Sequence, residues 1–156
     1  MKCNLLSLIA LSAIFLSCTS THKEAGVAVP LQGTWTLISG TMDEKGKITT
    51  TYYTKDQQMI KIINDTHFAF LKHALKPDSA GKNNFDAGGG TYTLSGEDYT
   101  EKLEYYNDRN WEGKSFSFKV KIQNDTLIQT GVEKVEGAGI DRIITEKYLR
   151  TKDKTD

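Results

Sequence analysis

Apolar and polar residues alternate with a period of two along most of the chain, which is the pattern of strands in a pleated sheet. In residues 31–39, Trp35 and Leu37 alternate with threonines, and residues 114–122 show the same alternation. No segment has the apolar spacing and capping residues of a long helix, so the pattern predicts an all-β fold. The strands that we expect are residues 31–39, 59–64, 67–72, 91–95, 99–106, 114–122, 126–130 and 140–151.

The connections between these strands alternate in length. Short turns at residues 64–66, 96–98 and 124–125 are rich in Asn, Asp and Gly, which favour tight turns. In an up-and-down meander consecutive connections fall at opposite ends, so the short turns should gather at one end and the longer loops at the other. The pattern predicts an eight-stranded up-and-down antiparallel barrel with one closed end and one mouth, a fold that can enclose one small ligand. The longer loops are expected at residues 40–58, 73–90, 107–113 and 131–139, with Gly88-Gly89-Gly90 as a flexible loop end.

We expect the first residues to form an export signal and not part of the barrel. Lys2 precedes an apolar run over residues 5–16 that is shorter than the about 20 residues that span a bilayer. Phe15-Leu16-Ser17-Cys18 resembles the lipobox of bacterial lipoproteins, in which the cysteine is acylated and becomes the mature N-terminus. We therefore expect a signal peptide at residues 1–17, a lipidated Cys18 beginning a tether over residues 18–30, and a bacterial envelope lipoprotein in the outer membrane. The alternative is an ordinary cleaved signal in which Cys18 has no role.

Composition and charge narrow the classes of protein. With 156 residues and 38% hydrophobic content, the chain is long enough for one ordinary domain. Its 20 basic and 20 acidic residues give a formal net charge of +0, which provides no field to attract nucleic acid. Removal of the signal would also remove Cys3 and leave Cys18 as the only thiol, so the barrel should be stable without an internal disulfide.

The beginning and end of the expected barrel carry a recognisable pair of motifs. Gly33-Thr34-Trp35 opens the first strand, and Tyr148-Leu149-Arg150 closes the last. With eight meandering strands, residues 31–151 resemble the lipocalins and the wider calycin superfamily, in particular bacterial lipocalin-like lipoproteins. The resemblance implies that Trp35 packs at the closed base beneath Arg150. Residues 152–156 would be a polar tail.

The expected barrel carries no recognisable catalytic or metal-binding pattern. A Gly-x-Ser-x-Gly elbow is absent, and Glu101 and Glu104 should point to opposite faces of one strand, so they would not act as a carboxylate pair. His67 and His73 would be about 20 Å apart along a continuous strand, too far to bind one zinc ion. We expect no enzyme activity, no cofactor and no metal.

The candidate binding residues follow from strand alternation and from the position of the mouth. In residues 114–122 one face carries Phe116 and Phe118, and this apolar face should point inward. Aromatic walls with a few polar groups are typical of small-molecule pockets. The candidates are Leu37, Phe70, Tyr92, Glu101, Leu103, Tyr105, Trp111, Phe116, Phe118 and Arg142. Each of these side chains could instead fill a solid core, the charged ones could form structural ion pairs, and Trp111 could be an unimportant surface residue.

Two functions of different classes fit these observations. The first is a membrane-anchored barrel that binds a small hydrophobic or amphipathic molecule in its lumen. The second is an envelope protein-interaction or inhibitor module with a packed barrel, whose loops contact a protein partner. A cavity large enough for a ligand would distinguish the first from the second.

Overall fold

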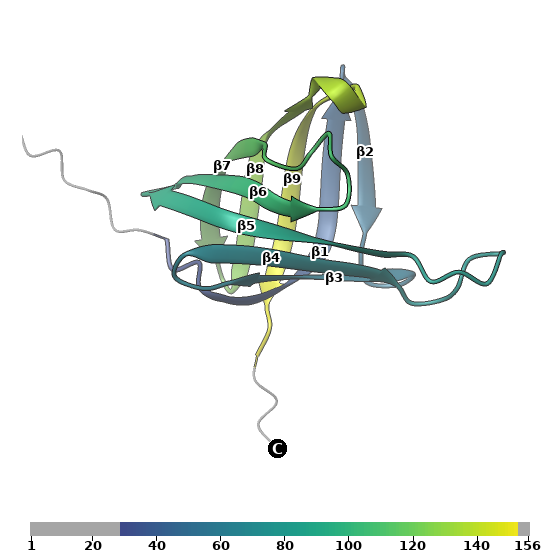
Figure 1. Cartoon of the computed structure of the whole chain (residues 1–156). Coiled ribbons are helices and arrows are strands. Elements are labelled where there is room, and N and C mark those ends of the chain that lie inside the picture. The colour runs from purple at the N-terminus through teal and green to yellow at the C-terminus, as the bar shows by residue number, and fades with distance from the viewer. Residues whose placement is uncertain (1–28, 153–156) are drawn as a thin grey trace, which may run out of the picture.

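The computed structural model describes residues 29–152, and Cys18 lies outside them. Within this range, nine antiparallel strands and one short 3₁₀ helix follow each other along the chain (Figure 1). The elements are β1 (Gly33–Glu44), β2 (Lys47–Tyr52), β3 (Gln57–Ile63), β4 (His67–Ala74), β5 (Phe85–Ser95), β6 (Asp98–Tyr106), β7 (Ser115–Gln123), β8 (Thr126–Val135), η1 (Glu136–Ala138) and β9 (Ile140–Arg150).

Eight of the strands close into an up-and-down barrel, as the sequence predicted. The strand order is β1-β3-β4-β5-β6-β7-β8-β9, and β9 pairs back onto β1 from Trp35↔Arg150 to Asp43↔Ile143. Figure 1 shows β7, β8, β9 and β1 crossing β3, β4, β5 and β6 at a steep angle. The tight turns β3–β4, β5–β6 and β7–β8 lie at one end, and the connections at residues 53–56, 75–84, 107–114 and 136–139 lie at the mouth.

The ninth strand, β2, corrects the expectation of a long loop at residues 40–58. β1 continues to Glu44, turns over Lys45 and Gly46, and returns as β2. Both turn residues have positive φ, 53° and 85°, as a two-residue hairpin of the primed type requires. β1 therefore divides one edge between two partners, because β3 pairs only with residues 33–36 and β2 pairs with residues 39–44. β2 is exposed, so its threonine-rich sequence lacks the apolar alternation that identified the other strands.

The glycine triplet at residues 88–90 is also not a loop end, because it lies inside β5. β5 pairs with β4 through these glycines and continues to Ser95. A Cβ atom on Gly90 would lie 1.9 Å from the carbonyl oxygen of Lys102, so glycine allows β6 to approach this closely. The register between β5 and β6 shifts here: Gly89 faces Tyr105 and Gly90 faces Leu103, which leaves Glu104 as the extra residue of a β-bulge.

The closed half of the barrel is a solid core. Trp35, Leu37, Tyr148 and Leu31 have at most 1% of their surface exposed. The indole N–H of Trp35 donates a hydrogen bond to the carbonyl oxygen of Leu31 at 2.8 Å, which holds the segment before β1 across the base. Other apolar core residues of this half are Ile63, Phe68, Tyr99, Val120 and Leu127. Any ligand site must therefore lie in the other half, towards the mouth.

Candidate functional site

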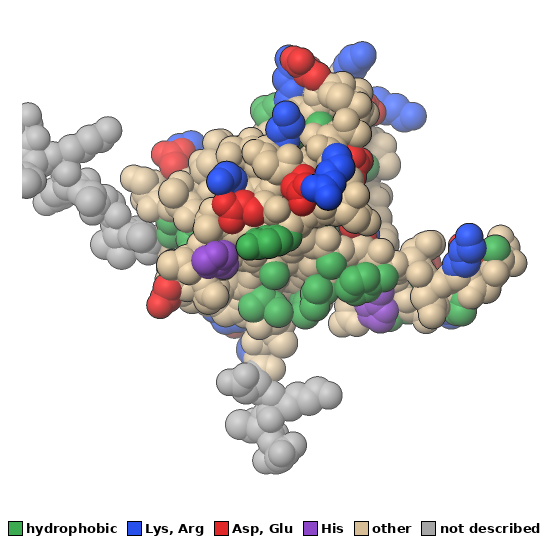
Figure 2. Space-filling view, viewed as in Figure 1, with side chains coloured by type: hydrophobic (Ala, Val, Ile, Leu, Met, Phe, Trp, Pro, Cys, Tyr) green, Lys and Arg blue, Asp and Glu red, His purple; other side chains and the backbone are tan. Residues whose placement is uncertain are grey.

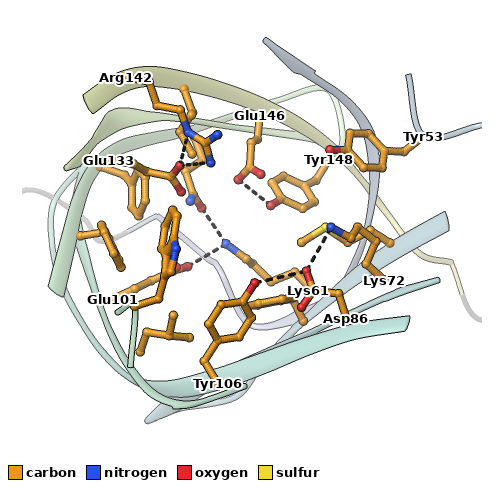
Figure 3. Close-up of a pocket in the computed structure, with 18 residues that line it drawn as sticks. Tyr53, Lys61, Lys72, Asp86, Glu101, Tyr106, Glu133, Arg142, Glu146 and Tyr148 are labelled. Carbon is orange, nitrogen blue, oxygen red and sulfur yellow. Dashed lines mark hydrogen bonds and ion pairs between the residues drawn. The ribbon is translucent and has the colours of Figure 1, made fainter. Parts of the chain in front are cut away.

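A cavity of about 220 Å³ occupies the mouth half of the lumen (Figure 3). It reaches solvent at the rim, where the side chains of Lys72 and Asp86 are 35% and 24% exposed. Seven of the residues proposed from the sequence line it: Phe70, Glu101, Leu103, Trp111, Phe116, Phe118 and Arg142. The barrel is therefore packed at its base and hollow near its mouth.

Leu37 and Tyr92 do not line this cavity, because strands β1 and β5 are longer than the sequence indicated. β1 runs seven residues beyond Leu37, so this side chain lies in the solid core instead of at the mouth. β5 begins at Phe85, which moves Tyr92 towards the closed end. There its hydroxyl donates a hydrogen bond to the carbonyl oxygen of Asn64 at 2.8 Å.

Tyr105 points outward and is 70% exposed, whereas its neighbour Tyr106 lines the cavity. The bulge at Glu104 explains why Tyr106, and not Tyr105, points inward. Before the bulge, Glu101 and Leu103 face inward with the expected period of two. The extra residue shifts the inward–outward alternation of side chains by one position. Inward residues are therefore odd-numbered before the bulge and even-numbered after it.

A buried ion pair crosses the floor of the cavity. The Lys61 ammonium, on β3, lies 2.7 Å from the carboxylate of Glu101 on β6 and donates a second hydrogen bond to Gln129 Oε1 on β8 at 3.1 Å. These three residues are 3%, 7% and 1% exposed. The aromatic ring of Tyr148 lies 5.3 Å from the same ammonium, within the range of a cation–π contact. Buried charges require such pairing, because a lone ion would lose its hydration without compensation.

Lys61 was missed by the sequence analysis, although its position carried a signal. It stands between Met59 and Ile63 on the inward face of an otherwise apolar strand. A lysine on an apolar face needs an acidic partner, and Glu101 was already expected inside the barrel. Gln129 carried no comparable signal, because its neighbours in β8 do not distinguish the two faces clearly.

A second ion pair lies on the wall of the cavity between β8 and β9. The guanidinium of Arg142 contacts one carboxylate oxygen of Glu133 through both Nε and Nη2, at 2.7 and 2.6 Å. The same guanidinium lies 5.8 Å from the ring of Trp111. Glu133 was not expected, because β8 was predicted to end at residue 130 and in fact extends to Val135. Trp111 is thus part of the cavity wall and not an isolated surface residue.

Glu146 is the remaining carboxyl group in the lumen. Its Oε2 accepts a hydrogen bond from the Tyr148 hydroxyl at 2.7 Å, and no cation forms an ion pair with it among the described residues. Burial raises the pKa of Glu146 above its ordinary value, and the nearby carboxylates of Glu101 and Glu133 raise it further. The Lys61 charge and the Tyr148 hydrogen bond act in the opposite direction. Burial likewise raises the pKa of Tyr148, so its hydroxyl stays protonated and donates.

Aromatic rings form the wall above these charges. Tyr106 contacts Phe70 and Trp111, with ring centroids 5.9 and 6.4 Å apart, and Trp111 contacts Phe116 at 5.5 Å. The Tyr106 hydroxyl also lies 3.4 Å from the carboxylate of Asp86, which pairs with Lys72 at 3.0 Å. Burial first, and then the Asp86 charge, raise the pKa of Tyr106 to about 12. The cavity therefore combines a charged floor with an aromatic wall.

The outer surface of the barrel carries its own apolar region. Figure 2 shows hydrophobic side chains gathered over β4 and β5. The most exposed of them are Phe85 at 63% and Tyr105 at 70%, and Leu71 is 40% exposed. Leu71 and Tyr105 line a shallow groove together with Ala69, Ala87 and Gly89. We call these six residues the outer apolar surface.

The expected partners at the closed base are in contact, since the Arg150 guanidinium carbon lies 4.0 Å from the centroid of the Trp35 ring. The two histidines of β4, His67 and His73, lie outside the cavity lining. Within residues 29–152, no group of three or more His, Cys, Asp or Glu side chains could hold a metal ion. The described part of the chain also has no helix long and apolar enough to cross a membrane.

No protein-family model matches this sequence, and a search of curated proteins finds no relative. The assignment to a class of protein therefore rests on the structure. It is an all-β, eight-stranded, closed up-and-down barrel with one additional strand, and this architecture is compatible with a lipocalin-like fold.

Proposed function

We propose that the barrel binds a small, partly apolar molecule in its lumen. The observation that carries this proposal is the cavity of about 220 Å³, which lies above a solid core and reaches solvent at the rim. Its aromatic wall would bury the apolar part of a ligand, and its charged floor would orient a polar group. Such convergence of a few polar groups in an aromatic pocket is typical of small-molecule sites.

The volume of the cavity limits the size of the ligand. A cavity of about 150 Å³ is enough for benzene, whereas pockets for drug-sized molecules have roughly 300 to 1,000 Å³. At about 220 Å³, this lumen suits a molecule with one ring and a short chain. Long acyl chains and tetrapyrroles are too large for it.

We infer that the site serves binding and not catalysis. Among the described residues that line the cavity there is no serine, threonine, cysteine or histidine to act as a nucleophile or neutral base. Lys61 and Arg142 are each held by a carboxylate, which favours a structural and orienting role for them. No cofactor is needed for a function of this kind.

An environment-sensitive apolar dye of one or two rings would test ligand binding. We expect the dye to bind the folded protein saturably and one-to-one. Phe118→Trp adds volume to the cavity wall and should weaken or abolish dye binding. Tyr105→Ala is the matched control, because it removes an aromatic ring that faces outward. Equal dye binding by wild type and Phe118→Trp, or no binding by either, would count against a ligand site in the lumen.

We further propose that acylated Cys18 attaches the protein to a bacterial envelope membrane. Support comes from the lipobox-like residues 15–18, which lie outside the described structure. One acyl chain gives only marginal membrane binding, so stable attachment needs the several chains of a lipoprotein. Cys18→Ala should move the protein from the membrane fraction to the soluble fraction, whereas unchanged membrane retention would contradict acylation.

The second candidate function is a module that binds an envelope protein, and the outer apolar surface favours it. Exposed apolar patches on soluble proteins often mark interaction sites. Leu71→Lys would place a charge in this groove without touching the lumen. Loss of a co-purifying protein in this variant, with dye binding in the lumen unchanged, would favour the interaction module.

A further inference from the structure

The lining of the cavity has one more carboxyl group than cationic groups among the described residues. Three cationic side chains line the cavity, and each has its own carboxylate: Lys61 with Glu101, Lys72 with Asp86, and Arg142 with Glu133. The fourth carboxyl group among the described lining residues is Glu146, and it has no cationic partner there. A ligand that supplied one positive charge would complete the set.

Glu146 also has one carboxylate oxygen that can accept a hydrogen bond from a ligand. Its Oε2 accepts the hydrogen bond of the Tyr148 hydroxyl, and no described residue donates a hydrogen bond to its Oε1. In Figure 3 the carboxyl group points into the cavity, with Tyr148 beside it and Lys61 on the floor below. The hydrogen bond from Tyr148 holds the carboxyl group in this direction.

The surrounding rings favour a cation in the same place. Four rings that can face a cation line the cavity, those of Tyr53, Tyr106, Trp111 and Tyr148. The negative faces of aromatic rings attract ammonium groups, and this attraction strengthens when water is excluded. An anionic ligand would be disfavoured, because Lys61 and Arg142 already contact carboxylates within 2.7 Å and would have to exchange them.

We propose that the ligand is a small arylalkylamine, an aromatic ring with an amine on a short alkyl chain, and that Glu146 binds its ammonium group. This inference rests on the proposed function, since it names the ligand class of the same cavity. The ammonium group donates a hydrogen bond to Glu146 Oε1, and the ring of the ligand packs against the aromatic wall formed by Phe70, Tyr106, Trp111 and Phe116. Glu146 acts here as a binding residue with no chemical step.

Three probes that share a 4-hydroxyphenyl ring and carry a short side chain separate the contribution of charge from that of the ring. They are tyramine, which is cationic, 4-ethylphenol, which is neutral, and 3-(4-hydroxyphenyl)propionate, which is anionic. Calorimetric titration at neutral pH should show tyramine binding at least about tenfold more tightly than 4-ethylphenol, because hydrogen bonds between charged groups are stronger than neutral ones. The anionic probe should bind most weakly.

Glu146→Gln tests the residue itself, since glutamine keeps the shape and can still accept a hydrogen bond from Tyr148. We expect the preference for tyramine over 4-ethylphenol to disappear while 4-ethylphenol affinity stays within about twofold of wild type. Glu97→Gln is the matched control, because this glutamate is exposed in the β5–β6 turn at the closed end. Circular dichroism would check that both variants fold. If Glu146→Gln does not fold, the three-probe comparison on wild type still tests the ligand class.

The outcomes separate this inference from the proposed function. If the three probes bind wild type with equal affinity, or the anion binds best, the amine assignment is wrong and ligand binding in the lumen stands. If the apolar dye binds but no probe does, the amine assignment is again wrong. If neither the dye nor any probe binds, both proposals are wrong. A preference for tyramine that survives in Glu146→Gln would overturn the role of Glu146.

Discussion

Arg150 lies over Trp35 at the closed end of the barrel, with its guanidinium carbon 4.0 Å from the indole centroid. Its Nη1 and Nη2 atoms donate hydrogen bonds to the carbonyl oxygens of Gln32 and Pro30, at 2.8 and 3.0 Å. The last strand thereby fastens the segment that enters the first strand. Because β1 and β9 pair at Trp35↔Arg150, this contact also marks the seam at which the barrel closes.

Substitutions of Trp35 and Arg150 should lower the free energy of unfolding by different amounts. Trp35→Ala removes a side chain with 0% exposure and should lower the free energy of unfolding by about 3 to 5 kcal/mol. Arg150→Lys keeps the charge but loses the guanidinium contact with the Trp35 ring and the two directed hydrogen bonds, so we expect a smaller loss of about 1 to 2 kcal/mol. Urea denaturation would measure both. An Arg150→Lys variant as stable as wild type would show that the stacking contributes little.

This contact was predictable because it depends only on strand number and direction. An up-and-down barrel with an even number of strands returns the end of the last strand to the start of the first, so Trp35 and Arg150 must meet whatever the exact strand lengths. The loops were less predictable for the opposite reason. Assigning residues 40–58 to a loop relied on the lack of apolar alternation, which is also the property of an exposed strand such as β2.

Gly33 should be the least replaceable of the glycines with positive φ. Its φ is 131°, and a Cβ atom there would lie 2.8 Å from Nη1 of Arg150. Gly33→Ala should therefore cost both backbone strain and the Arg150 contact, about 2 to 4 kcal/mol in total. Gly46→Ala is the control, because Gly46 also has positive φ, 85°, and its Cβ would meet nothing within 4 Å. Equal losses of stability in the two variants would contradict a specific clash with Arg150.

The buried pair Lys61–Glu101 should show strong coupling. Lys61→Met leaves the Glu101 carboxyl group without its partner and should destabilise the protein by about 3 to 5 kcal/mol. Lys61→Met combined with Glu101→Leu removes both charges and should recover most of this loss, although Gln129 then loses one hydrogen bond. Thermal unfolding of wild type, the two single variants and the double variant forms a complete cycle. Additive losses would mean that the two charges are stabilised independently.

The composition of the lumen could be predicted only in part, and one extra residue in β6 accounts for the misplacement of Tyr105. Strict alternation along β6 placed Glu101, Leu103 and Tyr105 on one face, and it was correct up to the bulge at Glu104. A β-bulge depends on how two strands fit each other, here where Gly90 lets β6 come close, and sequence alternation within one strand does not report it. The partner of Arg142 likewise depends on the register between β8 and β9, and Lys61 meets Glu101 and Gln129 across the lumen, so alternation within one strand reports neither contact.

Stability should depend on pH through Glu146. The pKa of this carboxyl group is raised above its ordinary value of 4.5, because burial and the carboxylates of Glu101 and Glu133 outweigh Lys61 and the Tyr148 hydrogen bond. Between 4.5 and the raised value, the folded protein binds more protons at this site than the unfolded chain does. The contribution of Glu146 to stability therefore falls as pH rises through that window. Glu146→Gln is uncharged at every pH, so its free energy of unfolding should improve relative to wild type as pH rises from about 4.5 towards neutral.

Urea denaturation of wild type and Glu146→Gln at a series of pH values would measure this difference directly. Other groups near Glu146, namely Arg142 on β9, Glu133 on β8, Glu101 on β6, Lys61 on β3 and Tyr53 before β3, are common to both proteins, so their direct contributions largely cancel in the comparison. Glu97→Gln, at an exposed turn, should track wild type over the same range. A difference between wild type and Glu146→Gln that stays constant with pH, or that changes in the opposite direction, would show that Glu146 is not held with a raised pKa. Adding tyramine at neutral pH should reduce the difference, because the ammonium group would stabilise the ionised carboxylate in wild type only.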